Sequence, residues 1–303
     1  MQQHLTGLLL CSGLTLMAPA AALAAPPPLP AAQTGLDVRS GADSDRFRGT
    51  GYHEVTADGS FAGPGFTGHG HAYAGVRASF AGPPRPVAAV DVSADWPCCG
   101  STAAATAIGT ASFVYYAQVI NWAAPPPLPV PLAQLPINFI VSDYVSASVG
   151  GTPPPQSGSG SMTATVSVFR NLGHVGILLD RARASGNSDA ETNSSFAAVS
   201  GKVNEVFGVT LAAEGSFTAG GNYGGSGSGH AVADPLFEFD QASFDQYLIG
   251  QGFAPFHLAN YFAFEFSDGV VAGVPEPQTW ALWFAGVAAL VWRRGAAWHG
   301  TRR

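Results

Sequence analysis

Lysine, charge and cysteine are all scarce in this chain. Lys202 is the only lysine, charged residues make up 11% of the sequence, and 38 glycines and 23 prolines are spread through it. Scarce charge combined with abundant glycine and proline argues against a cytosolic helical enzyme and favours short strands joined by many turns. The hydrophobic fraction of 47% is nevertheless large enough for a substantial core.

Three cysteines are too few for a disulfide framework. Cys11 lies in an N-terminal apolar segment, and Cys98 and Cys99 are adjacent, so the pair cannot join distant parts of a fold. Pro97 before the pair and Gly100 after it favour a turn. A redox or metal role for the pair stays open at this point, as does its oxidation state.

Positive charge is sparse in the body of the chain. All 20 acidic residues lie at or before Glu276, whereas four of the 13 basic residues follow the C-terminal apolar run. The body therefore carries nine basic against 20 acidic residues, a net charge of −11 with neutral histidine. Scattered arginines in an acidic body lack the basic stripe that phosphate backbones require, so we expect no nucleic-acid partner.

Familiar catalytic motifs are also missing. The sequence contains no G-x-S-x-G, no H-E-x-x-H and no P-loop, so it predicts no enzyme, no catalytic residue and no cofactor. Paired acids could serve glycoside hydrolysis, which needs two carboxylates about 5–10 Å apart, but acids that flank turns are usually solvated. The pairs concerned are Asp43/Asp45, Asp189/Glu191 and Glu238/Asp240.

Histidine offers only a weak metal site. His69-Gly70-His71 would point two imidazoles to the same face of a strand, and His53 is the third candidate ligand. Two ligands do not make a site, and no nearby cysteine or carboxylate completes a convincing set, although Glu54 and Asp58 are close in sequence. We therefore predict no metal.

The N-terminus is typical of a secretory signal. Residues Leu5 to Leu23 are uncharged and mostly apolar, and Ala22-Leu23-Ala24 supplies the small-x-small pattern that signal peptidase recognises. We expect residues 1–24 to be the signal peptide, with cleavage before Ala25. Residues 25–34 then form a proline-rich connector.

A second apolar run lies near the C-terminus. Trp280 to Trp292 is uninterrupted and ends at Arg293-Arg294. A helix over residues 278–292 would span roughly 22 Å, which is short for a hydrocarbon core of about 30 Å but workable with snorkelling arginines. A buried helix is the other interpretation. Tryptophans near both ends and the lack of a polar face favour a membrane anchor with the body outside the cytoplasm.

The order of features at this end is specific. Val274-Pro275-Glu276-Pro277, the apolar run and Arg293-Arg294 together resemble a PEP-CTERM sorting signal, over residues 274–303. The resemblance implies export, a transient stay in the inner membrane and processing by an exosortase, a membrane cysteine transpeptidase of bacteria that make exopolysaccharide. It assigns recognition by that enzyme to Pro275, Glu276 and Pro277, with Arg293 and Arg294 as the basic stop of a tail over residues 293–303.

The segment between the two ends, residues 35–272, is expected to be a β-sandwich-like exported domain. Proline-rich Pro125–Pro131 and Pro153–Gly160 are interpreted as loops within one domain, with a two-domain division as the alternative. Gly220–Gly229 is expected to be a flexible surface loop. Strands are predicted where apolar and polar residues alternate or β-branched residues cluster: Gly51–Thr56, Ala111–Ile120, Ile137–Val149, Met162–Phe169, Phe196–Val209, Ala231–Phe239 and Tyr261–Phe266.

These features predict an exported surface or extracellular-matrix protein associated with exopolysaccharide or biofilm. Its expected partners are signal peptidase and the export machinery, the inner membrane, an exosortase and exopolysaccharide. The alternative is a secreted β-sandwich that binds or hydrolyses polysaccharide.

Overall fold

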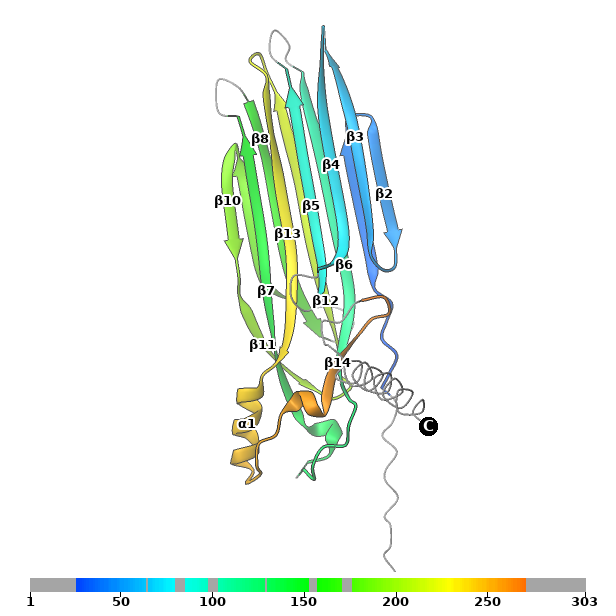
Figure 1. The fold of residues 1–303 in the computed structure, drawn as a ribbon, viewed down its shortest axis with the longest axis vertical. Helices are drawn as coiled ribbons and strands as arrows, with labels where there is room; N and C mark the ends of the chain where they lie inside the picture. Colours follow the sequence, from blue (N-terminus) through cyan, green and yellow to red (C-terminus); the bar gives the residue numbers. More distant parts are fainter. Residues whose placement is uncertain are drawn as a thin grey trace, which may run out of the picture.

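Two antiparallel sheets of seven strands each form the body of the protein. The computed structural model describes residues 26–63, 65–79, 85–97, 103–128, 130–152, 157–170 and 176–270. The sheets lie face to face, and their long strands run along the long axis of the molecule (Figure 1). This confirms the mainly β, sandwich-like fold.

Several predicted features lie outside the described residues: the signal peptide, Cys98 and Cys99, and the sorting signal over residues 274–303. In the part of the chain that is described, no helix has the length and apolar character to cross a membrane.

The first sheet has the strand order β2-β1-β6-β12-β8-β9, and β14 pairs with the end of β6. Its strands are β1 (Gln33–Ser40), β2 (Asp43–Gly49), β6 (Ala104–Asn121), β8 (Ser157–Arg170), β9 (Gly176–Gly186), β12 (Val206–Gly220) and β14 (Phe262–Phe266).

The second sheet has the order β10-β7-β13-β5-β4-β3, and β11 pairs with β7. Its strands are β3 (His53–Gly63), β4 (Phe66–Ser79), β5 (Arg85–Trp96), β7 (Pro136–Gly151), β10 (Ser188–Asn193), β11 (Phe196–Lys202) and β13 (Gly225–Phe239).

Strands from both sides of the proline-rich stretches share each sheet. β6 precedes Pro125–Pro131 and pairs with β12, which follows Pro153–Gly160. In the second sheet, β5 pairs in the same way with β13. The pieces of the chain before and after the proline-rich stretches are therefore joined by two strand ladders, one in each sheet.

Alternation along each strand creates the core between the sheets. Every second residue of β6 from Ala105 to Phe113 is buried, and its neighbours face solvent. The core is lined by alanine and valine over much of its length, and its phenylalanines gather towards the end that carries α1 (Gln241–Gly250). There Phe139 stacks on Phe207 with ring centroids 4.6 Å apart, and Phe239 stacks on Phe264 at 4.5 Å.

The phenylalanine stripe of the last strand packs as predicted. Phe262 and Phe264 are buried, and Phe266 packs against the core from a partly buried position. The strand begins at Phe262 rather than Tyr261, which ends a 3-10 turn at Leu258–Asn260.

The prediction of a flexible loop over Gly220–Gly229 is wrong. Only residues 221–224 form the turn, and β13 begins at Gly225. The segment alternates glycine with serine, and its glycines occupy inward positions where a large side chain would collide with the opposite sheet. A Cβ at Gly229 would clash with Met162, and one at Gly227 with Phe217.

A similar error affects the second proline-rich stretch, because β8 already begins at Ser157. Gly158 and Gly160 lie within this strand, beside the ring of Phe217. Another predicted strand, Phe196–Val209, is divided. Asn204 has a φ of 65° in the turn between β11 and β12, and these two strands belong to different sheets.

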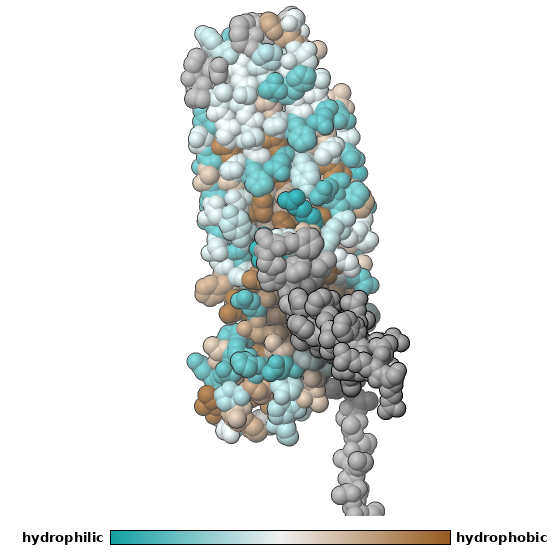
Figure 2. Space-filling model, in the orientation of Figure 1, coloured by the Kyte–Doolittle hydropathy of each residue, from teal (hydrophilic) through white to brown (hydrophobic). Residues whose placement is uncertain are grey.

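Helix α1 was not predicted from the sequence. Asp240 begins it, since the carboxylate accepts hydrogen bonds from the Ser243 amide at 3.0 Å and the Ser243 hydroxyl at 2.6 Å. Phe244 and Leu248, one turn apart, are its buried residues. Figure 2 shows hydrophobic residues around this end of the molecule, where Ile249 is 62% exposed.

Both ends of the described body meet at the α1 end. The Ser267 hydroxyl donates to the Pro30 carbonyl at 2.7 Å and accepts from the Tyr116 amide at 2.8 Å. Buried Gln118 donates to the Pro27 carbonyl at 3.0 Å and to Glu265 at 2.6 Å. The beginning and the end of the body are therefore held against the same part of β6.

Candidate functional site

The three candidate metal ligands do not converge. His69 and His71 lie on the same outward face of β4, as the sequence predicts, opposite Ser60 and Asp58 of β3. His71 Nδ1 lies 2.7 Å from the Asp58 carboxylate. His53 is five positions along β3 from Asp58, roughly 17 Å away, and its ring stacks on Phe47 of β2. Among the described residues, no group of three or more histidine, cysteine or acidic side chains could hold a metal.

The paired acids bind main-chain groups. Asp43 of β2 accepts a hydrogen bond from the Asp58 amide of β3 at 2.8 Å. On β10, Asp189 accepts from the Ser185 amide at 2.9 Å, and Glu191 accepts from the Arg183 amide at 2.7 Å. Asp240 caps α1. Four of the six acids thus accept main-chain hydrogen bonds, and Asp43 and Asp189 do so while exposed to solvent.

Arginines gather on the outer face of the first sheet. In one register of paired residues, Arg46 and Arg183 stand at the two edges, on β2 and β9. In the neighbouring register, Arg48 and Arg181 occupy the same two edges. Arg39 of β1 is also exposed on this face. We name this surface the arginine-bordered face. It carries five of the nine basic residues of the body.

Small polar residues fill the space between the two edges. From β2 to β9 the two registers read Arg46–Asp37–Thr110–Glu214–Thr163–Arg183 and Arg48–Gly35–Ser112–Ala212–Thr165–Arg181. Five strand spacings make each register about 24 Å wide. Around Glu214 the surface forms a shallow open trough of about 220 Å³.

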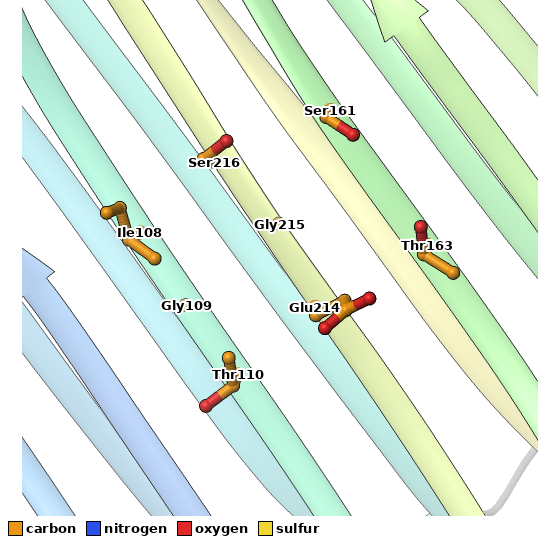
Figure 3. A pocket seen from close by; sticks show the side chains of 8 residues that line it. All are labelled: Ile108, Gly109, Thr110, Ser161, Thr163, Glu214, Gly215 and Ser216. Atoms are coloured by element: carbon orange, nitrogen blue, oxygen red, sulfur yellow. The ribbon is translucent and has the colours of Figure 1, made fainter.

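Figure 3 shows the side chains that line this trough. Glu214 of β12 lies between Thr110 of β6 and Thr163 of β8, and Ser216 and Ser161 follow in the next register. Ile108 is the one large apolar side chain of the lining, and it is 42% exposed. The trough therefore presents hydroxyl groups around a single exposed carboxylate.

Charge is distributed unevenly over the arginine-bordered face. Asp37 is held by Arg46, whose Nε lies 2.7 Å from Oδ2, and by Arg39, whose Nε lies 3.2 Å from Oδ1. The hydrogen bond from Arg39 is the main cause that lowers the pKa of Asp37. No described acidic side chain forms an ion pair with Arg48, Arg181 or Arg183.

The outer face of the second sheet has a different chemistry. His230 of β13 bonds to Asp91 of β5, and this hydrogen bond raises the pKa of the imidazole. Tyr73 of β4 lies beside Asp91 and donates to Glu54 at 2.9 Å. Burial and the Glu54 carboxylate raise the pKa of Tyr73 to about 12. A trough of about 560 Å³ borders His230, Ser148 and Ser188.

Sequence reasoning missed the arginine-bordered face because its arginines come from distant segments. Arg46 and Arg183 are separated by more than a hundred residues, and only the sheet order brings their strands to opposite edges of one surface. The local signal was present nonetheless: Arg46 and Arg48, and Arg181 and Arg183, are each two residues apart and so share a face of their strand.

Comparisons with family models, with curated proteins and with solved structures found no match to this chain.

Proposed function

We propose that this chain is an exported surface or extracellular-matrix protein that is anchored briefly in the inner membrane and processed by an exosortase at Pro275-Glu276-Pro277. The observation that carries the proposal is the order of the C-terminal sequence, in which this tripeptide precedes a short apolar run and Arg293-Arg294. Proline fixes its own φ angle and disfavours a helical conformation at the preceding residue, so a Pro-Glu-Pro sequence suits a processing enzyme that accepts extended peptides.

The geometry of the body is compatible with attachment at one end. Residues 26–30 and residues 267–270 lie together at the α1 end through the Ser267–Pro30 and Gln118–Pro27 hydrogen bonds. β6 alone has 18 residues, or roughly 60 Å of strand. A body tethered through residue 270 could therefore extend its long axis away from the membrane and present both sheet faces to the surroundings.

Replacement of Pro275, Glu276 and Pro277 by alanine tests the proposal. In an exosortase-containing host, we expect the variant to remain in the inner-membrane fraction and the unchanged chain to reach the cell surface or the medium. Alanine substitution of Pro153, Pro154 and Pro155 is the control, because it removes prolines elsewhere and should leave sorting intact. Normal release of the variant at residues 275–277 would refute the assignment.

The alternative function, a β-sandwich that binds or hydrolyses polysaccharide, has support for binding in the arginine-bordered face. Binding of a polymer is compatible with a role in the matrix. Four of the six paired acids, in contrast, accept main-chain hydrogen bonds, so the pairs lend no specific support to hydrolysis.

A further inference from the structure

We propose that the arginine-bordered face binds an anionic polysaccharide, a sugar polymer that carries carboxylate groups. This inference names a ligand class for the proposed matrix protein. It rests on the proposed function only for the location, outside the cytoplasm, at which protein and polymer would meet. The binding itself involves only side chains of the body.

The charge of this face opposes that of the molecule. Five arginines and two acidic residues, Asp37 and Glu214, give the face a net charge of +3 within a body of −11. Arg48, Arg181 and Arg183 form no ion pair with a described acidic side chain, although the Glu191 carboxylate, which accepts from the Arg183 amide, also attracts Arg183 electrostatically. A guanidinium binds a carboxylate through two parallel hydrogen bonds, which makes arginine well suited to this ligand.

The spacing of the arginines favours a polymer over a small anion. Arg48 and Arg181 stand about 24 Å apart across the sheet, so the two edges cannot hold one small ion together. Along each edge, neighbouring arginines are two residues, or about 7 Å, apart. An extended polymer with carboxylates at intervals could contact both edges while it crosses the strands between them.

The centre of the face favours sugar over nucleic acid. Thr110, Thr163 and Glu214 can exchange hydrogen bonds with sugar hydroxyls, and Glu214 can only accept while ionised. Duplex DNA carries about one negative charge per 1.7 Å of axis, so Asp37 and Glu214 would repel it along much of the contact. A polysaccharide carries fewer charges and many hydroxyl donors, which match a carboxylate surrounded by hydroxyl groups.

Affinity electrophoresis of the full chain, exported by a bacterial host and purified in detergent, tests the inference. The protein would be run through gels that contain polygalacturonate, dextran or single-stranded DNA. We expect retardation by polygalacturonate, weaker retardation at higher salt, and none by dextran. The Arg181→Gln/Arg183→Gln variant should bind polygalacturonate about five- to thirtyfold more weakly, because two exposed ionic contacts are lost.

Arg77→Gln is the matched control, since Arg77 is an exposed arginine on the outer face of the second sheet. It should bind like the unchanged chain, and circular dichroism should show that all variants are folded. The inference would be overturned if the Arg181/Arg183 variant bound polygalacturonate as strongly as the unchanged chain does. It would also be overturned if dextran retarded the unchanged chain as much as polygalacturonate does. Stronger retardation by DNA would assign the face to nucleic acid, and self-association that the double substitution abolishes would assign it to a second copy of the chain.

The two proposals can fail separately. Loss of polygalacturonate binding in the Arg181/Arg183 variant does not depend on sorting, and sorting of the variant at residues 275–277 does not depend on the face. If the recovered chain binds polygalacturonate but still carries its C-terminal tail, the binding site is supported and exosortase processing is refuted.

Discussion

Glycine allows the two sheets to approach each other near Phe217. The ring of this buried β12 residue lies against Gly151, Gly158, Gly160 and Gly227. A Cβ at Gly151 would fall well inside 3.0 Å of the Gly158 carbonyl, whereas a Cβ at neighbouring Gly150 would meet nothing within 4 Å. The two adjacent glycines of β7 therefore tolerate a methyl group very differently.

Gly151→Ala should lower the free energy of unfolding by about 1–3 kcal/mol, because the main chain of β8 must shift to admit the new methyl group. Gly150→Ala faces solvent and should change stability by less than about 0.5 kcal/mol. Chemical denaturation of the two variants measures the difference. Equal stability of the two variants would show that glycine does not set the approach of the sheets here.

His230 of β13 is paired with Asp91 of β5. Its hydrogen bond to Asp91 raises the pKa of the imidazole above its ordinary value of 6.5, and partial burial opposes this change. A raised folded-state pKa means that the pair stabilises the fold below pH 6.5 and that this contribution is lost as pH rises through the folded value. The His230 side chain is 44% exposed, so solvent limits the contribution to at most about 1 kcal/mol.

NMR titration should give His230 a pKa above 6.5, and Asp91→Asn should lower that pKa. Asp95→Asn, on the same strand but without a contact to His230, is the control and should leave it nearly unchanged. A pKa at or below 6.5 in the unchanged protein would contradict the ion pair.

At the scale of elements, the open edges of the two sheets are protected by side chains. β9 ends the first sheet and β10 ends the second, and three alternate residues of β10 bond the main chain of β9. Asp189 and Glu191 accept from the Ser185 and Arg183 amides, and Asn193 donates to the Arg181 carbonyl at 2.7 Å. These bonds occupy groups that could otherwise pair with a strand of another molecule.

Asp189→Ala with Glu191→Ala should therefore promote association of the protein. The variant leaves two β9 amides without their acceptors, and light scattering should detect concentration-dependent growth together with a lower unfolding midpoint. Asp95→Ala with Glu238→Ala removes the same charge from the outer face of the second sheet and should stay monodisperse. If both variants behave alike, loss of charge rather than loss of edge protection is responsible.

Acidification should weaken the hydrogen bonds between Glu191 and β9 only below pH 4.5. Hydrogen bonds from Asn193 and the Arg183 amide lower the pKa of Glu191 below its ordinary value of 4.5. Its contribution is therefore complete above 4.5 and is lost as pH falls through the lower folded-state value.

Element prediction from sequence succeeded for several strands with alternating apolar residues, missed others such as β1 and β5, and failed where glycine occupies the inward positions. Strands β6, β7 and β14 have clear apolar faces and were predicted. The first half of β13 has glycine at its inward positions, so its alternation with serine resembled a loop. Helix α1 carries a detectable signal, an Asp240 cap and apolar residues at Phe244 and Leu248, which was not recognised.

At the scale of the whole molecule, the sandwich-like fold could be predicted from the strand patterns. Which residues meet on each outer face could not. Which strands lie at the edges depends on pairings between distant residues, such as β6 with β12, that local patterns do not specify. The arginine-bordered face is a consequence of that order. The predicted sorting signal, in contrast, is local in sequence and needs no fold to be recognised.

The proposed membrane attachment and the exposed sheet faces lie in different parts of the chain. The first and last residues of the described body lie together at the α1 end, and the sheet faces lie along the length of the sandwich (Figure 1). A protein released from the membrane after cleavage near residue 275 would retain both faces unchanged. The position at which the mature chain ends therefore distinguishes a processed protein from one that keeps its C-terminal segment.

Mass spectrometry of the protein recovered from the cell surface or the medium measures that end. We predict a carboxyl terminus at or near Val274 to Pro277, with the segment Trp280–Arg303 absent and an amino terminus at Ala25. Recovery of surface or released protein that still carries Trp280–Arg303 would contradict exosortase processing.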